Sequence, residues 1–199
     1  MLPTEEAGAP QPARLTRPVV LIGFMGAGKT KVGRIAAQYI GCDFVDTDHI
    51  VERSAGKSIP QLFAEIGEER FRHLETEAIE HALNTHGGII ALGGGAATRE
   101  ENWQLLRRSG AMTIYLQASP RTILARVADK GTRPLLAGLD RQQMLEKITS
   151  LLEQREPWYL RADITLPTDN SLDKYGMADT LVARLKEAGI SAAESHRTS

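Results

Sequence analysis

The most specific chemical pattern in the chain is the glycine-rich stretch GFMGAGKT, at residues 23–30. Gly23, Gly28, Lys29 and Thr30 satisfy G-x-x-x-x-G-K-[ST], with an apolar run before them and a helical pattern after them. Glycines adopt backbone conformations closed to other residues, so successive N–H groups can surround a phosphate at a helix N-terminus. Lys29 would reach the outer phosphates, and the Thr30 hydroxyl is a hard oxygen ligand for Mg²⁺. Pattern and context together favour a nucleoside triphosphate site over a plain glycine-rich turn.

Two aspartates follow the second apolar run, in the segment DFVDTDHI. Asp46 and Asp48 lie near the expected carboxyl end of a strand, where ligands of open α/β sheets bind. Asp46 could hold Mg²⁺ directly or through water, and Asp48 could accept a hydrogen bond from a substrate hydroxyl. Both could instead cap the next helix, and this segment alone does not decide between the two interpretations. The chain has no N-K-x-D motif, which disfavours a guanine-specific switch.

A candidate site for an acidic substrate follows further along the chain. Arg72 and Glu75 are three residues apart in ERFRHLETEAIE and share a helix face. An arginine there could bind a carboxylate through two N–H groups while Glu75 holds the guanidinium, although a weak surface salt bridge is the alternative. Gly93, Gly94 and Gly95 end the apolar run GIIAL. Three glycines at a strand end allow a close approach to the backbone.

The elements that must position these residues follow from the alternation of apolar runs with helical patterns. The runs VVLI, CDFV, GIIAL, MTIYL and ADITL predict five strands. Helices are expected over residues 29–40, 99–109, 120–128 and 172–188. Further helices are expected between the second strand and about residue 85, and one long helix is expected to end at about residue 160. Repeated units of this kind predict a parallel sheet with helices on both faces. Residues 129–140, DKGTRPLLAGLD, are predicted to form an extended loop.

Composition narrows the class of protein. The chain has 199 residues, 42% of them hydrophobic, with a mean hydropathy of -0.25 and a net charge of -1. We therefore expect a single folded domain over residues 17–188, disordered ends at 1–16 and 189–199, and no nucleic-acid or membrane partner. No long apolar segment or signal peptide is found, so a cytoplasmic location is expected. The single cysteine, Cys42, excludes an intramolecular disulfide and is expected to be a small buried residue.

The ordered series GFMGAGKT, DTD, FRHLE, GGG, RPLL and REPWY resembles the shikimate kinases, small P-loop kinases related in fold to the nucleoside monophosphate kinases. The resemblance spans about residues 17–188. It implies a three-layer α/β/α P-loop kinase fold with a five-stranded parallel sheet. It also implies a small substrate-binding helical region near residues 47–78 and a mobile lid near residues 129–140.

The resemblance further implies the activity and the residues that carry it. The γ-phosphate of ATP would pass to the 3-hydroxyl of shikimate, giving shikimate 3-phosphate and ADP, with Mg²⁺ as cofactor. Lys29, Asp48 and Arg133 would be catalytic, with Arg133 as a lid arginine over the transferring phosphate. The residues that would bind ATP are Gly26, Ala27, Gly28, Lys29, Thr30, Lys31, Arg126 and Arg133, and Arg126 would stack on the adenine. Those that would bind shikimate are Asp48, Arg72, Gly93, Gly94, Gly95 and Arg155, with Arg72 and Arg155 on its carboxylate. Thr30 and Asp46 would bind the metal. We expect a monomer that acts on these two small molecules.

Two rival interpretations remain. Another small-metabolite kinase, gluconokinase-like or a nucleotide kinase, would share the P-loop, and sugar acids also carry a carboxylate. A nucleotide-binding regulatory module with a decayed site is disfavoured because no expected catalytic position is missing. In REPWY, Pro157 is expected to end or kink the long helix, and Trp158 and Tyr159 are expected to pack in the core.

Overall fold

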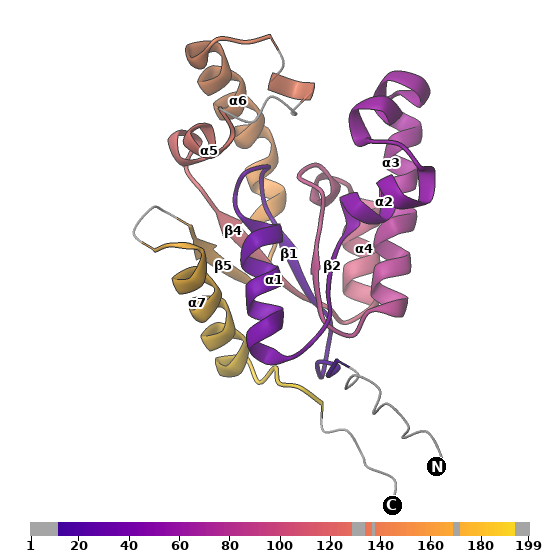
Figure 1. Cartoon of the computed structure of the whole chain (residues 1–199), viewed down its shortest axis with the longest axis vertical. Coiled ribbons are helices and arrows are strands. Elements are labelled where there is room, and N and C mark those ends of the chain that lie inside the picture. The colour runs from indigo at the N-terminus through magenta and orange to yellow at the C-terminus, as the bar shows by residue number, and fades with distance from the viewer. Residues whose placement is uncertain (1–11, 129–133, 137, 169–171, 194–199) are drawn as a thin grey trace, which may run out of the picture.

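A sheet of five parallel strands forms the centre of the molecule (Figure 1). The computed structural model describes residues 12–128, 134–136, 138–168 and 172–193. The strands are β1 (Val19–Ile22), β2 (Phe44–Asp46), β3 (Ile89–Ala91), β4 (Met112–Gln117) and β5 (Ile164–Pro167), in the spatial order β2-β3-β1-β4-β5. The central strand β1 is buried along its whole length, as expected for a sheet covered on both faces. The predicted five-stranded parallel sheet is thereby confirmed.

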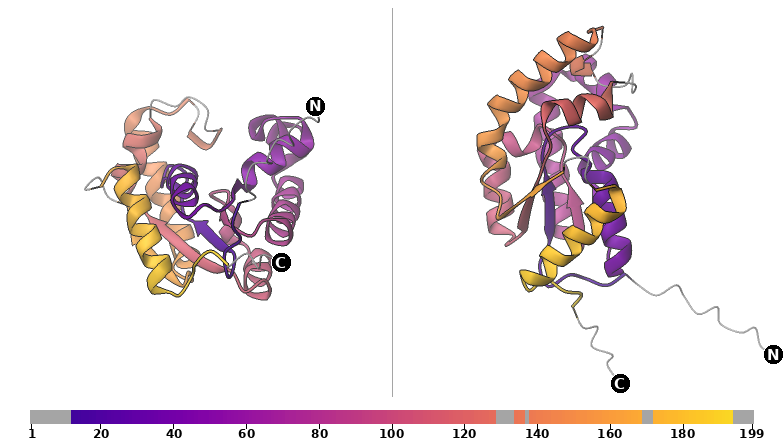
Figure 2. Two further views of the ribbon diagram at one scale, coloured as in Figure 1. Left: turned by 60° about the horizontal axis from the view of Figure 1, so that its bottom comes forward. Right: turned by 90° about the vertical axis from the view of Figure 1, so that its left-hand side faces the viewer.

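Helices cover the sheet on both faces and complete the three layers (Figures 1 and 2). The helices are α1 (Lys29–Ile40), α2 (Thr47–Ala55), α3 (Ile59–Thr85), α4 (Glu100–Arg108), α5 (Pro120–Val127), α6 (Arg141–Tyr159) and α7 (Lys174–Glu187). The right-hand view of Figure 2 places α1 and α7 on one side of the sheet and α4 and α6 on the other. None of the helices in the described ranges is long and apolar enough to cross a membrane.

Local sequence signals explain where several helices begin, end or bend. Helix α1 ends at Gly41, which has a left-handed φ of 81°, a conformation in which glycine commonly terminates helices. Helix α3 changes direction at Gly67, whose φ of 74° is not helical. Helix α6 continues through Pro157 to Tyr159, so the proline does not end it. Tyr159 is fully buried, and its tertiary contacts hold the turn that the proline weakens.

The folded part extends beyond residues 17 and 188 on both sides. Leu15 and Ile190 are buried, at 6% and 3% exposure. Short β-bridges join Ala13 to Cys42 and Leu15 to Ala192, while residues 1–11 and 194–199 lie outside the described part. The Cys42 thiol is itself buried, which raises its pKa to about 11 and keeps it protonated. It has the character of a small apolar residue, as expected.

Candidate active site

A cleft of about 850 Å³ lies at the carboxyl edge of the sheet, where the loops after β1, β2, β3 and β5 meet. Parallel strands end together at this edge, so residues far apart in the chain line one space. The predicted site residues on its wall are Gly26, Ala27, Gly28, Lys29, Thr30, Lys31, Asp46, Asp48, Gly94 and Arg126. Arg72, Gly93, Gly95 and Arg155 are joined to this wall through the contacts described below. Arg133 lies outside the described residues.

The loop between β1 and α1 requires glycine for its shape. Gly23, Gly26 and Gly28 have φ values of 137°, 78° and 105°, which residues with side chains rarely adopt. A Cβ on Gly23 would also lie 2.6 Å from the Leu116 carbonyl oxygen. The Lys29 ammonium donates to the carbonyls of Gly23 at 2.8 Å and Phe24 at 3.0 Å. The lysine that begins α1 is therefore tied to the loop that precedes it.

Thr30 and Asp46 meet at the mouth of this loop. The Thr30 hydroxyl donates to Asp46 Oδ2 at 2.7 Å, and Asp46 Oδ1 accepts from the Asp48 N–H at 3.1 Å. Asp46 is thus both the N-cap of α2 and the neighbour of Thr30, so the two interpretations of this aspartate hold together. Two hard oxygens at this place fit Mg²⁺, which keeps several waters and binds through few protein ligands.

Arg126, at the end of α5, joins the P-loop to the end of β5. Its guanidinium donates to the carbonyls of Gly26 at 3.4 Å, Ala27 at 3.2 Å and Thr168 at 3.0 Å. Thr168 is buried and lines the cleft, and sequence reasoning missed it. Its position directly after the last strand was the signal that could have found it. The predicted lid is described only in part: residues 134–136 form a short 3₁₀ helix, and Leu136 is buried.

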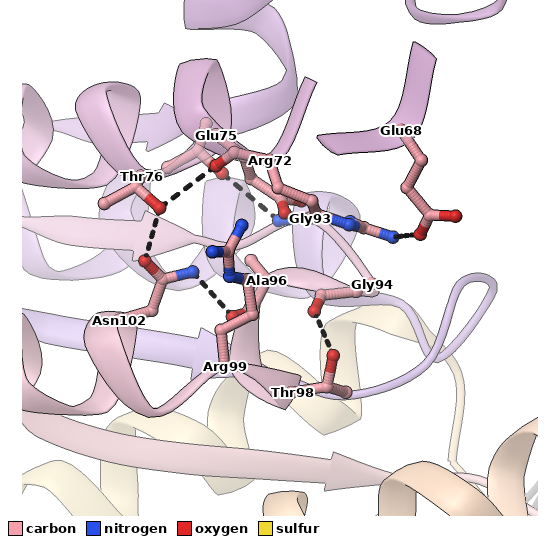
Figure 3. A network of polar contacts seen from close by, with 12 residues as sticks. Glu68, Arg72, Glu75, Thr76, Gly93, Gly94, Ala96, Thr98, Arg99 and Asn102 are labelled. Carbon is pink, nitrogen blue, oxygen red and sulfur yellow. Dashed lines mark hydrogen bonds and ion pairs between the residues drawn. The ribbon is translucent and has the colours of Figure 1, made fainter. Parts of the chain in front are cut away.

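On the opposite side of the cleft, Arg72 forms ion pairs with two glutamates of α3 (Figure 3). Its guanidinium lies 2.9 Å from Glu68 and 2.9 Å from Glu75. The side chains of Arg72 and Glu75 are only 17% and 2% exposed, so the pair is not the weak surface salt bridge that the sequence left open. Burial raises the pKa of Glu75, while the positive charges of Arg72, Arg155 and Arg99 oppose that rise.

The three glycines after β3 each make room for a different neighbour. A Cβ on Gly93 would lie 2.5 Å from Asp48 Oδ1 and 2.7 Å from Glu75 Oε1. A Cβ on Gly95 would lie 2.5 Å from Arg72 Nη1, and one on Gly94 would lie 3.0 Å from the backbone nitrogen of Met25. The close approach that the glycines predicted is therefore made by the candidate site residues themselves and by the P-loop.

The end of α6 reaches the same turn from another direction. Arg155 Nη1 donates to the Gly94 carbonyl at 3.3 Å, and the guanidinium lies 5.4 Å from the centre of the Phe24 ring. The Tyr159 hydroxyl donates to the same carbonyl at 2.5 Å. Tyr159 is buried as predicted, but sequence reasoning missed that its hydroxyl ends at the glycine turn.

Arg99 is a further cation that sequence reasoning did not select. It follows the short 3₁₀ helix Ala96–Thr98 and caps α4. Figure 3 shows its guanidinium pointing toward the Arg72 and Glu75 side chains. It also pairs with Glu101 at 2.6 Å. Its nearness in sequence to the three glycines was the available signal, and only the fold brings it beside Glu75.

A buried hydrogen-bond chain holds this region together (Figure 3). The Thr76 hydroxyl lies 2.9 Å from Asn102 Oδ1, and the Asn102 amide donates to the Ala96 carbonyl at 2.8 Å. Asn102 is fully buried, so these bonds satisfy polar groups that water does not reach. Helices α3 and α4 are thereby linked to the segment that follows the glycine turn.

Comparison with known proteins agrees with this arrangement. A model of the shikimate kinase family matches residues 25–186. A shikimate kinase from Moorella thermoacetica is 43% identical over 171 residues, covering 85% of this chain and 92% of the relative. One from Chlorobium limicola is 39% identical over 156 residues, covering 76% of this chain and 78% of the relative. The structure of an Acinetobacter baumannii shikimate kinase in complex with shikimate superposes with a TM-score of 0.79 at 32% identity, covering 86% and 94% of the two chains. This chain therefore belongs to the shikimate kinase family.

Proposed function

We propose that this protein transfers the γ-phosphoryl group of ATP to the 3-hydroxyl of shikimate, giving shikimate 3-phosphate and ADP. Membership of the family supports the reaction class. The observation that carries the proposal is the glycine turn after β3, which has Asp48 and Arg72 against two of its glycines and Arg155 on the carbonyl of the third. That turn also abuts the P-loop at Met25. A phosphate donor and a small acidic acceptor can thus meet in one cleft.

On the acceptor side, we assign Arg72 and Arg155 to the carboxylate of shikimate. Both are held before any substrate arrives, Arg72 by its ion pairs and Arg155 by the Gly94 carbonyl and the Phe24 ring. A preorganised guanidinium loses less conformational entropy on binding, and its planar geometry favours a planar anion such as a carboxylate. Asp48 accepts a hydrogen bond from the attacking hydroxyl and orients its oxygen. Gly93, Gly94 and Gly95 have no side chains, so Asp48, Arg72 and the P-loop come close to the turn beside which we place the ring.

On the donor side, we assign the phosphates to the backbone N–H groups of residues 26–31 and to the ammonium of Lys29. The N-terminus of α1 adds its partial positive charge. Arg126 contacts the nucleotide base, beside Thr168. Thr30 and Asp46 would hold Mg²⁺, which would supply positive charge against that of the phosphates. Arg133 closes over the transferring group and keeps water from competing with the hydroxyl.

These parts suit a reaction that asks for alignment and charge stabilisation more than for covalent chemistry. The shikimate oxygen forms a bond to the γ-phosphorus as the bond from that phosphorus to ADP breaks, and the hydroxyl proton leaves along its hydrogen bond to the Asp48 carboxylate. Lys29 stabilises the charge that spreads over the phosphoryl oxygens. A hydroxyl held by Asp48 and a carboxylate held by two arginines bring the attacking atom into line, which is the largest contribution that the acceptor side can make.

The test is ADP release by the purified chain with ATP, Mg²⁺ and, in parallel, shikimate, gluconate or a nucleoside monophosphate. We expect turnover with shikimate that is lost on chelation of Mg²⁺ by EDTA and restored by added Mg²⁺. Turnover above the blank with gluconate or a nucleotide alone, and none with shikimate, would overturn the proposal. Light scattering in the same buffer tests the further expectation of a monomer.

A further inference from the structure

We propose that Tyr159 is a positioning residue for the acceptor, because its hydroxyl holds the Gly94 carbonyl and so sets the orientation of the glycine turn. The inference rests on the proposed function and extends it to a residue that touches neither substrate. Tyr159 lies at the end of α6, is fully buried behind the cleft wall, and donates to the Gly94 oxygen at 2.5 Å. Arg155, one helical turn earlier, donates to the same oxygen at 3.3 Å.

The glycine turn needs a hydrogen bond of this kind to fix its backbone. Gly94 and Gly95 have no side chains to fix the peptide unit between them, and glycine passes readily among backbone conformations. The peptide bonds of the described residues are all trans, so the Gly95 N–H points away from the Gly94 carbonyl. Two donors on that carbonyl therefore turn the Gly95 N–H away from α6. Arg72 lies against Gly95, so a rotation of this peptide would disturb the contact between them.

The Tyr159 hydroxyl is suited to a hydrogen bond that persists under all working conditions. Burial raises the pKa of Tyr159 to about 12, so the group remains a donor at every pH at which the enzyme would work. Its ring packs against that of Tyr115, with centroids 5.1 Å apart, and a ring locked in this way has one accessible hydroxyl position. The hold is therefore rigid and does not depend on bound substrate.

Tyr115 supplies a matched control within the same pair of rings. It is also fully buried, but its hydroxyl points to Glu156 Oε1 at 3.4 Å and not to the glycine turn. Tyr159→Phe and Tyr115→Phe each remove one buried hydroxyl and keep both rings. A merely structural role predicts the same behaviour from the two variants, whereas a positioning role separates them.

The experiment combines steady-state kinetics with hydrogen exchange on the full chain. For Tyr159→Phe we expect the KM for shikimate to rise about five-fold, which corresponds to one buried hydrogen bond, while the KM for ATP changes less than about two-fold. Amide exchange of a peptide covering residues 93–98 should become faster in this variant without any substrate. Tyr115→Phe should leave both quantities at their wild-type values, and thermal unfolding of the two variants should differ little.

Equal shikimate KM values and equal exchange in the two variants would overturn the inference. A rise in both the ATP KM and the shikimate KM by the same factor would also overturn it, because the hold would then act on the cleft as a whole. A wild-type chain without shikimate-dependent turnover would overturn the proposed function instead. The exchange measurement would still decide whether Tyr159 holds the turn.

Discussion

The proposed donor half and the proposed acceptor half of the cleft are built in different ways. Nearly all of the donor half comes from residues 23–31, which are the loop between β1 and α1 and the first residues of α1, with Arg126 and Thr168 added from elsewhere. The acceptor half takes Asp48 from α2, Arg72 from α3, three glycines from the turn after β3 and Arg155 from α6. The first depends on local backbone geometry, and the second depends on how four separate segments pack.

The glycines of the two halves differ in the same way, by local backbone geometry in one and by packing in the other. Gly23 has a left-handed backbone and lies against the Leu116 carbonyl, which cannot move without the strand that carries it. Gly93 and Gly95 instead lie against the polar ends of Asp48, Glu75 and Arg72, which can come this close because glycine has no side chain. A substitution in the donor half should therefore disturb the conformation of the whole loop. A substitution in the acceptor half should weaken the use of shikimate and not that of ATP.

The largest effect is expected from Lys29→Met, on the donor side. Removal of the positive charge that we assign to the phosphoryl oxygens should lower kcat by about 100- to 1000-fold. Lys31→Met is the control, because Lys31 lines the same cleft but is exposed to solvent, which screens its charge. ADP release under saturating substrates measures both. Similar losses in the two variants would contradict the special role of Lys29.

Arg72→Ala should break the acceptor half alone. Loss of charge-assisted hydrogen bonds to the carboxylate should raise the KM for shikimate about 10- to 100-fold, with the KM for ATP nearly unchanged. The variant also leaves Glu75 buried without its partner, which should cost about 3 kcal/mol of unfolding free energy.

The double variant Arg72→Ala with Glu75→Gln separates the two consequences. It should recover most of the stability in urea denaturation, because no buried carboxylate then lacks a partner, and it should not recover the KM. Equal loss of shikimate and ATP affinity in the single variant would show that Arg72 does not belong to the acceptor half.

A pair of glycine variants compares the two halves through stability. Gly23→Ala combines a strained backbone with a clash against a carbonyl and should cost about 2 kcal/mol. Gly93→Ala meets the ends of side chains that can shift, and should cost about 1 kcal/mol while displacing Asp48. Urea denaturation gives both values. The reverse order would mean that the acceptor half is the more rigid of the two.

The smallest effect is expected outside both halves, at Glu100 on α4. Ion pairs with Arg161 and Arg107 lower the pKa of this exposed carboxylate from an ordinary value of 4.5 to about 2. The folded state favours its charged form, so its contribution to stability is present above pH 4.5 and is lost as the pH falls toward 2.

Glu100→Gln should therefore show a shallower decrease in melting temperature over that acidic range than the wild type. The difference should shrink in high salt, because exposed charges are screened. Neither substrate KM should change. An unchanged acid profile in the variant would show that these ion pairs contribute nothing measurable.

Much of the fold could be predicted because its signals are local. Apolar runs marked the five strands, and Gly41 marked the end of α1. The second strand was predicted from Cys42 but begins at Phe44, since Cys42 pairs with Ala13 instead. The burial of Leu15 and Ile190 was not expected, because each packs against residues distant in sequence.

The candidate site divides in the same manner. Lys29, Thr30, Asp46 and Arg72 could be selected by residue type and spacing. Thr168 and Arg99 had only weak sequence signals, their places after a strand and near the glycines, and their contacts with Arg126 and Glu75 come from the fold.

The sequence by itself determined the phosphate loop, since glycine backbone preferences and the start of a helix act within about ten residues of chain. It also determined that the strands are parallel, because the helices between them force each strand to return to the same edge. Only the tertiary structure decided that Arg72 is buried with Glu75, that the three glycines face Asp48, Met25 and Arg72, and that Tyr159 ends at Gly94. Those contacts join segments as much as 65 residues apart, and their geometry is set by packing density and not by any local preference.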